Sequence, residues 1–166
     1  MVIPFTYVFA QEAKGADQYV LGAMVTGLAV VPFLLGIPLG RLADKIGRKK
    51  VLYWIGPIFW ASNLLLIWAT GPITLILAGA LQGFFFMNTV VTGAMTFELV
   101  PHEQMGRWLG MVRFFRMVPA AGSAYLAGFL WDHLGPQWVF LFFIGLDILI
   151  RMPLLIGMPE TLGPRK

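Results

Sequence analysis

The chain has no cysteine, and charged residues make up only 12% of its 166 positions. Without cysteine it can form no disulfide, thiol nucleophile or thiolate metal site. Soluble domains carry about 25% charged residues, so these residues cannot cover a fold that faces water on all sides. The catalytic and metal-binding motifs of common enzymes are missing as well, and the two histidines fall in separate turns. We expect a protein that is not an enzyme, with no cofactor and no metal.

Hydrophobic residues make up 58% of the chain, and its mean hydropathy is +0.78. A helix that crosses a bilayer needs about 20 apolar residues. Five runs are long enough: 16–40, 51–69, 73–97, 106–130 and 137–158. A shorter apolar piece, 1–10, spans about half a bilayer and is expected to be the end of a helix that begins upstream. The predicted fold is an all-α, polytopic membrane bundle, with residues 1–166 forming one transmembrane domain in the lipid bilayer.

Charge placement predicts how the bundle is oriented. Segment 41–50 holds five of the twelve basic residues, and the turn near residue 102 and the tail 159–166 fall on the same side. Cytoplasmic loops carry the excess of lysine and arginine. We therefore expect a multi-pass protein of the cell (plasma or inner) membrane, with this loop and the C-terminus in the cytoplasm. The net charge of +4 lies in short turns, which does not favour nucleic acid as a partner.

One loop carries a specific pattern of glycine and charge. Its fixed positions are Gly40, Asp44, Lys45, Gly47, Arg48 and Lys49. They resemble the loop G-x-x-x-D-[RK]-x-G-[RK]-[RK] of the major facilitator superfamily, and every position matches. Two further segments, "ELVPHEQMGRWLG" (98–110) and "MPETLG" (158–163), resemble turns of that family, although Met105 stands where an arginine is common. On physical grounds alone, the charges either fix topology or latch one face of the bundle as a gate.

The resemblance implies one half of a twelve-helix secondary transporter, paired with another six-helix half in the same or a separate chain. Such a protein moves a small-molecule substrate by rocker-switch alternating access, in some members with a coupling proton. The predicted fourth helix lacks the arginine of first halves, so the chain resembles a second, C-terminal half and is expected to be a fragment or half. The alternative is a non-transporting membrane scaffold or a receptor-like bundle.

Polar residues recur on one face of the run 73–97. Gln82, Thr89, Thr92 and Thr96 follow a helical spacing, with Asn88 at the edge of the stripe. The resemblance implies that this helix lines the central cavity, which makes the stripe a candidate substrate pathway. The alternative is a set of hydrogen bonds between helices.

The run 106–130 carries arginines at increasing depth. Arg116 lies near the bilayer midplane, where an unpaired cation is costly. It needs an anionic substrate, a water-filled cavity or an acid from the missing half; Ser123 follows on the same helix. The shallower Arg113 can join Glu98 and Arg107 in a cytoplasmic charge network.

Asp147 and Arg151 lie four residues apart in the last apolar run. An acid at this depth can carry a coupling proton. A pair at this spacing on one helix can also neutralise itself. Both interpretations stay open at the level of sequence.

Overall fold

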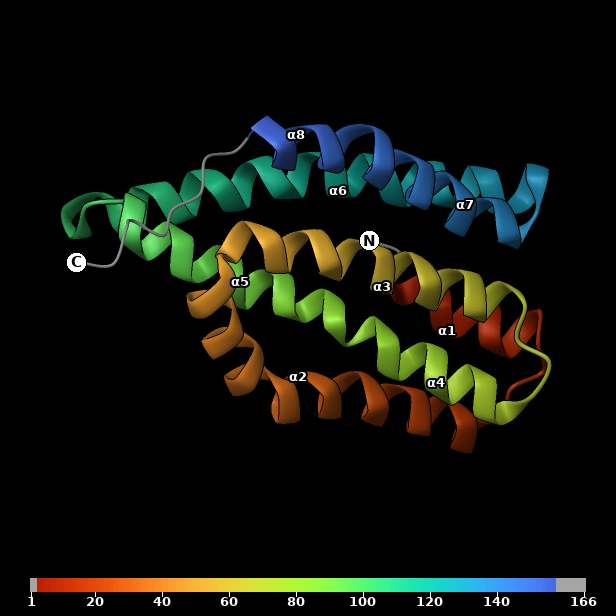
Figure 1. Ribbon diagram of the computed structural model, residues 1–166. Helices are drawn as coiled ribbons and strands as arrows, with labels where there is room; N and C mark the ends of the chain where they lie inside the picture. Colours follow the sequence, from red (N-terminus) through yellow and green to blue (C-terminus); the bar gives the residue numbers. More distant parts are fainter. Residues whose placement is uncertain (1–2, 158–166) are drawn as a thin grey trace.

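The computed structural model describes residues 3–157, apart from the side chains of residues 98 and 99. Every element in this part is helical, which confirms the predicted all-α bundle (Figure 1). The expected tail 159–166 and the segment 158–163 lie outside the described residues. The elements are α1 (Ile3–Glu12), α2 (Gln18–Ile46), α3 (Arg48–Ile67), α4 (Pro72–Gln82), α5 (Phe84–Leu99), a 3-10 turn (His102–Gln104), α6 (Met105–Leu134), α7 (Pro136–Leu146), a π-helical turn (Asp147–Arg151) and α8 (Met152–Gly157).

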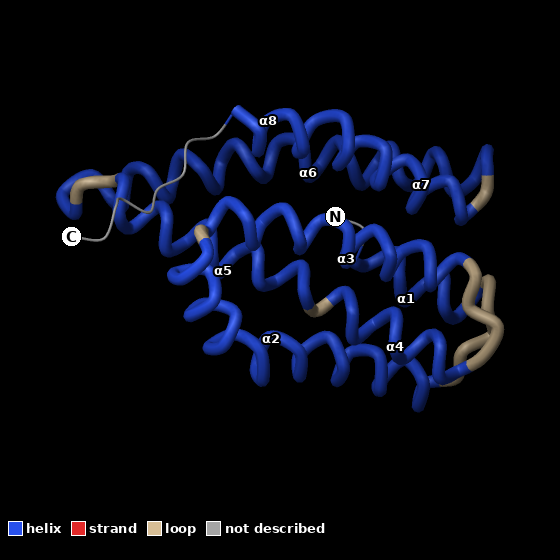
Figure 2. The backbone as a smooth tube through the Cα atoms, viewed as in Figure 1, coloured by secondary structure: helices blue, strands red, loops and turns tan. Residues whose placement is uncertain are grey.

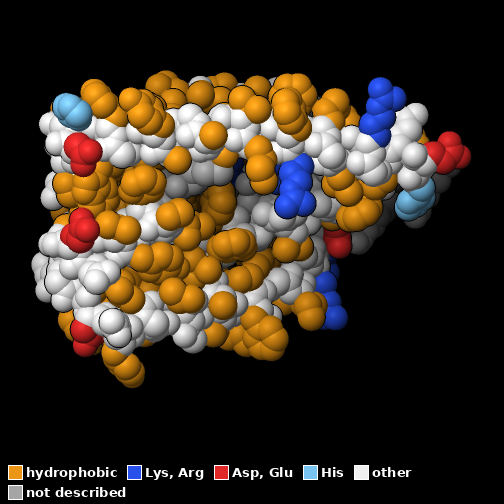
Figure 3. All heavy atoms as spheres, turned by 180° about the vertical axis from the view of Figure 1, so that it is seen from behind, with side chains coloured by type: hydrophobic (Ala, Val, Ile, Leu, Met, Phe, Trp, Pro, Cys, Tyr) orange, Lys and Arg blue, Asp and Glu red, His pale blue; other side chains and the backbone are white. Residues whose placement is uncertain are grey.

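Within residues 3–157, four helical stretches are long and apolar enough to cross a membrane. They are Gln18–Ile46, Arg48–Ile67, Pro72–Phe97 and Pro136–Gly157. The fifth expected span, α6, has 30 residues but a less apolar composition, because Arg113 and Arg116 interrupt it. Figure 3 shows hydrophobic side chains over most of the visible surface, which is the surface that a bilayer would cover.

The structure shortens the loop expected at 41–50 to a single residue. Helix α2 continues to Ile46, and α3 begins at Arg48. Gly47 between them has φ 109° and ψ 132°. Glycine reaches positive φ at no steric cost, so one residue is enough to reverse the chain. At the other end of α2, the carboxylate of Asp17 accepts a hydrogen bond from the Val20 amide at 2.8 Å and caps the helix.

The helices run side by side, and the turns gather at the two ends (Figure 2). Helix α2 packs on α4 and α5, α3 packs between these and the stretch α7–α8, and α6 packs along α7. One end holds Gly47 and the 3-10 turn, and we call it the basic end. The opposite end holds Glu12, Asp17 and Asp132, and we call it the acidic end; acidic side chains collect there in Figure 3.

Helices α2 and α4 approach each other through glycine. A Cβ on Gly79 would lie 2.9 Å from the Cα of Met24, and one on Gly83 would lie 2.7 Å from the carbonyl oxygen of Leu28. These distances leave no room for a side chain, so the two backbones are in direct contact. Gly83 also separates α4 from α5, and that break divides the expected span 73–97 into two helices.

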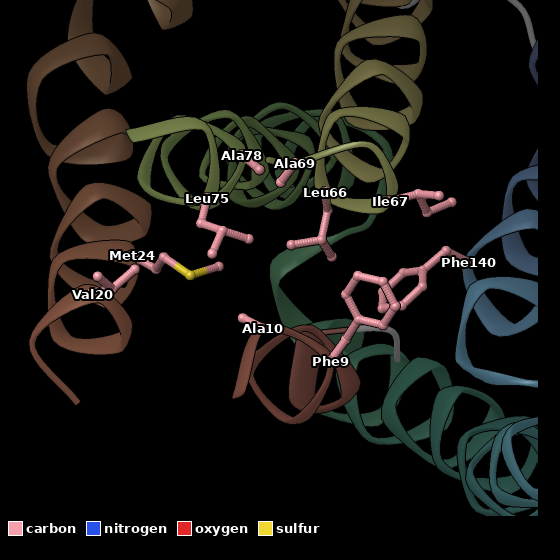
Figure 4. Packing of buried hydrophobic residues seen from close by; sticks show 10 residues of the cluster. All are labelled: Phe9, Ala10, Val20, Met24, Leu66, Ile67, Ala69, Leu75, Ala78 and Phe140. Carbon is pink, nitrogen blue, oxygen red and sulfur yellow. The ribbon is translucent and has the colours of Figure 1, made fainter. Parts of the chain in front are cut away.

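The largest buried cluster lies toward the acidic end. Figure 4 shows Met24 of α2 pointing toward Leu75 of α4, while the rings of Phe9 and Phe140 lie together between α1 and α7. The two ring centroids are 5.1 Å apart in an edge-on arrangement, which is favourable for aromatic pairs. At the same end of the bundle, the ammonium group of Lys14 donates a hydrogen bond to the carbonyl of Ile67 at 2.6 Å.

Candidate functional site

A groove between α5 and α6 brings together most of the predicted pathway residues. Its volume is about 150 Å³. Positions 89, 92 and 96 of α5 follow the spacing of one helix face, as do positions 108, 112 and 116 of α6. Two consecutive helices, joined by the 3-10 turn, therefore form its walls. The lining residues are Thr89, Thr92, Gly93, Thr96, Phe97, Trp108, Leu109, Val112 and Arg116.

Two of the three threonine hydroxyls that line the groove donate to their own helix. Thr92 Oγ1 donates to the carbonyl of Asn88 at 2.7 Å, and Thr96 Oγ1 donates to the carbonyl of Thr92 at 2.9 Å. This back-bonding lets a polar side chain sit on a membrane helix without a partner from another helix. Because the hydroxyl hydrogens are used, the oxygens offer only lone pairs to the groove.

Arg116 is the charged residue of the groove. It lies 11 residues after Met105, the first residue of α6, which is about 16 Å along the helix. Its side chain is exposed, and no ion pair or hydrogen bond of Arg116 is found among the residues whose side chains are described, which leave out 98 and 99. Arg113 is exposed as well and does not line the groove. Ser123 is further along α6 and donates to Ala120 of its own helix at 2.9 Å.

Gln82, the first residue of the predicted stripe, does not reach the groove. It is 1% exposed, and its side-chain amide donates to Thr6 of α1 at 3.1 Å and to Asn63 of α3 at 3.5 Å. Asn63 in turn donates to the carbonyl of Phe59 at 2.8 Å. The Oε1 atom of Gln82 is buried and accepts no hydrogen bond within the described residues. Gln82 therefore belongs to a polar cluster that joins α1, α3 and α4. For this residue the structure matches the second interpretation of the stripe, a set of hydrogen bonds between helices.

Asp147 and Arg151 form an ion pair on the π-helical turn, at 3.2 Å. Asp147 also accepts a hydrogen bond from the indole of Trp60 at 2.7 Å, and Arg151 donates to the carbonyl of Leu52 at 3.2 Å. Both side chains are less than one-fifth exposed. The pair thus neutralises itself and also connects the last helical stretch to α3. The pair also lines a pocket of about 280 Å³, whose other lining residues are three phenylalanines, two isoleucines and a leucine.

The basic end holds the pattern of glycine and charge found in the sequence, in a defined geometry. Asp44 and Arg48 form an ion pair at 3.2 Å across Gly47, in which Arg48 is almost buried and Asp44 is half-exposed. Lys49 donates to the carbonyl of Ile156 in α8 at 2.9 Å. Lys45 is exposed, and a Cβ added at Gly40 would meet no atom within 4 Å.

Of the expected charge network of Glu98, Arg107 and Arg113, the structure describes the side chains of the two arginines. The side chain of Glu98 is outside the described part. Arg107 is exposed and lines a second groove of about 270 Å³ together with Gln104 and Trp108. Trp108 therefore stands between the two grooves, with Arg107 on one side and Arg116 on the other.

Several residues of these sites were not predicted from the sequence. Trp108 and Val112 precede Arg116 at intervals of four, and that spacing was the available signal for the apolar wall of the groove. Thr6, Asn63 and Trp60 carried no comparable signal, because each contacts a partner on another helix that is remote in the chain.

Comparison with known proteins shows a family whose model matches this chain, and several similar proteins. Residues 1–163 match the family model described as Major Facilitator Superfamily. The multidrug transporter MdfA of Edwardsiella ictaluri is 32% identical over 155 residues, which cover 90% of this chain and 37% of that protein. The putative multidrug resistance protein MdtD of Citrobacter koseri is 30% identical over 140 residues, covering 80% of this chain and 30% of that protein. The glucose transporter GlcP of Staphylococcus epidermidis is 28% identical over 166 residues, covering 94% and 36%. The chain thus spans about a third of the length of these relatives.

Proposed function

Because this chain belongs to the Major Facilitator Superfamily, we propose that it forms one six-helix half of a secondary transporter for a small solute. Two halves that rock against one another around a central site give alternating access. The other half comes from the same polypeptide or from a second chain. The lack of an arginine in the stretch 72–82 favours the second, C-terminal half.

The chain is an integral membrane protein, and we propose that its basic end faces the cytoplasm. Five of the twelve basic residues lie in the segment 41–50 at that end, and the acidic residues Glu12, Asp17 and Asp132 lie at the other. The excess of lysine and arginine in short cytoplasmic loops supports this orientation.

The observation that supports the transport pathway best is the groove between α5 and α6. It combines threonine oxygens with an exposed arginine in the middle of otherwise apolar helices. Polar groups at this depth are costly against lipid, so a water-filled cavity that faces the other half is the environment that suits them. A scaffold that only packs against a partner does not require a polar groove at this depth.

The ion pair of Asp44 and Arg48 is proposed as the gate latch of the cytoplasmic side. It holds the turn at Gly47, while Lys49 fixes the start of α3 to α8. In contrast, we assign Asp147 and Arg151 to holding the last helical stretch on α3. The described lining of the groove contains no acid, so the groove itself offers no carboxylate that could carry a coupling proton.

Cysteine accessibility separates a transporter from a scaffold without knowledge of the substrate. The experiment uses the complete transporter that contains this chain, with any cysteine of the other half removed. Thr92→Cys should react with a hydrophilic maleimide, because the groove opens to water in one of the two states. Leu149→Cys, which is 74% exposed on the last helical stretch, is the matched control and should stay unreactive in lipid. Equal protection of both positions would contradict the pathway and favour the scaffold.

A further inference from the structure

We propose that the groove between α5 and α6 receives the head of a small organic anion that carries a hydrogen-bond donor next to its acid group, as hydroxycarboxylates do. This inference rests on the proposed pathway and names the class of substrate that fits it. Three features of the groove support it: its charge, the direction of its hydrogen bonds and its size.

The charge of the groove is positive. Arg116 is the only ionisable residue among its lining residues. An arginine is protonated at any physiological pH, and one that stays unpaired near the centre of a membrane costs several kcal/mol at most sites. A carboxylate matches the planar fork of the guanidinium in a bidentate geometry, so a bound anion removes this cost.

No acid with a described side chain forms an ion pair with Arg116. Asp147 is bound by Arg151 and Trp60. Asp44 is paired with Arg48 at the basic end. The groove therefore has a surplus of one positive charge that nothing described in this half neutralises.

The hydroxyls of Thr92 and Thr96 can only accept a hydrogen bond from a ligand in the groove. Thr92 and Thr96 use their hydroxyl hydrogens within α5, so each presents an oxygen that can only accept. A ligand with a hydroxyl or amide N–H beside its acid group satisfies these oxygens while Arg116 holds the acid. A ligand without such a donor leaves the acceptors unpaired and binds less well.

The size of the groove limits it to the head of the ligand. Its volume of about 150 Å³ is that of roughly five waters at about 30 Å³ each. Phe97, Trp108 and Leu109 form its apolar wall, which suits the carbon atoms next to the charged group. The rest of a larger ligand would extend toward the other half.

The test measures ligand binding to the purified complete transporter, through the shift of its thermal unfolding midpoint with ligand concentration. Four probes share one aromatic body: mandelate carries an acid and a hydroxyl, phenylacetate only the acid, mandelamide no charge, and 2-phenylethylamine a positive charge. We expect mandelate to bind most tightly, phenylacetate next, and the neutral and cationic probes to give no shift.

Substitutions inside and outside the groove test whether mandelate binds in the groove. Arg116→Gln should weaken mandelate binding by about tenfold or more, and Arg116→Lys should keep the preference for anions. Arg113→Gln removes an arginine one turn away, outside the lining, and should bind mandelate as the wild type does. Thr92→Val combined with Thr96→Val should reduce the advantage of mandelate over phenylacetate. Glu98→Gln should change nothing.

Three results would overturn the inference: no shift with mandelate, equal shifts with 2-phenylethylamine, or unchanged mandelate binding in Arg116→Gln. A gain in affinity in Glu98→Gln would also overturn it, because it would make that acid the partner of Arg116. The proposed function is tested separately. If Thr92→Cys reacts with the maleimide but no anion binds, only the substrate class is contradicted. If mandelate binds but Thr92→Cys does not react, only the transport pathway is contradicted.

Discussion

The carboxylate of Asp44 and the guanidinium of Arg48 lie 3.2 Å apart on either side of Gly47, the one residue between α2 and α3 that is not helical. Arg48 is almost buried, whereas 55% of the Asp44 side chain is exposed. An exposed carboxylate contributes little to stability. The pair is therefore better suited to hold one conformation of the turn than to stabilise the fold.

Asp44→Asn should lower transport by the complete protein severalfold and leave its expression and unfolding temperature nearly unchanged. The neutral amide keeps the shape of the side chain but loses most of its attraction to Arg48. Flux into proteoliposomes, divided by the amount of reconstituted protein, is the measurement. Lys50→Gln is the control, because it removes an exposed charge from the same segment. Wild-type flux in Asp44→Asn would argue against the latch.

Gly83→Ala should destabilise the protein by about 1–3 kcal/mol, since a Cβ there would lie 2.7 Å from the Leu28 carbonyl oxygen and force α2 away from α4. Thermal unfolding in detergent measures the effect. Gly22→Ala is the matched control on α2, where an added Cβ would meet no atom within 4 Å. Equal unfolding temperatures of the two variants would show that the helices can separate without cost.

Asp147→Asn and Arg151→Gln should each destabilise the protein by about 3 kcal/mol or more, because each leaves a mostly buried charge without its partner. The double variant should recover part of that loss and should transport as the wild type does. Unfolding temperatures of the four proteins form the double-mutant cycle. If the double variant folded well but lost transport, Asp147 would have a role in coupling rather than in packing.

Gln82→Met should cost about 1–3 kcal/mol, because it removes the amide that donates hydrogen bonds to the buried side chains of Thr6 and Asn63. Replacing all three together, with Thr6→Val and Asn63→Leu, should restore much of the stability, since no unpaired group of the cluster then remains. Denaturant-free thermal scans in one detergent compare the variants. A triple variant less stable than Gln82→Met would mean that the cluster stabilises the bundle beyond its own pairing.

Single cysteines test the orientation, and the absence of native cysteine makes the labelling of this half unambiguous. A cysteine at Thr70, exposed at the acidic end, should react with an impermeant maleimide added to intact cells. A cysteine at Lys50, exposed at the basic end, should react only after the membrane is permeabilised. The reverse pattern would invert the proposed topology.

The sequence was sufficient for the helical class and for the approximate positions of the apolar runs, because hydropathy depends on composition over about 20 residues. Helical spacing also placed the three threonines on one face of their helix, but it did not predict that Arg116 of the next helix lines the same groove. The prediction of a loop over residues 41–50 was wrong for a local reason. Charged residues were taken to mark a loop, but Arg41, Asp44 and Lys45 extend α2, and only the φ of Gly47 ends it.

Gln82 shows where periodicity stops being informative. It lies on the same helix as the threonines, but Gly83 breaks that helix directly after it. The stripe therefore changes direction at the break, and Gln82 turns to α1 and α3. A single-sequence pattern contains no term for a partner 76 residues away, which is the separation of Gln82 and Thr6.

The bond from Lys49 to the carbonyl of Ile156 joins residues 107 positions apart. A ribosome that adds about 5–20 residues per second needs roughly 5 to 20 seconds to make the intervening chain. During that interval Lys49 cannot donate to Ile156, because α8 has not yet been made. This contact of the basic end therefore forms later in biosynthesis than the pair of Asp44 and Arg48, whose two residues are only four positions apart.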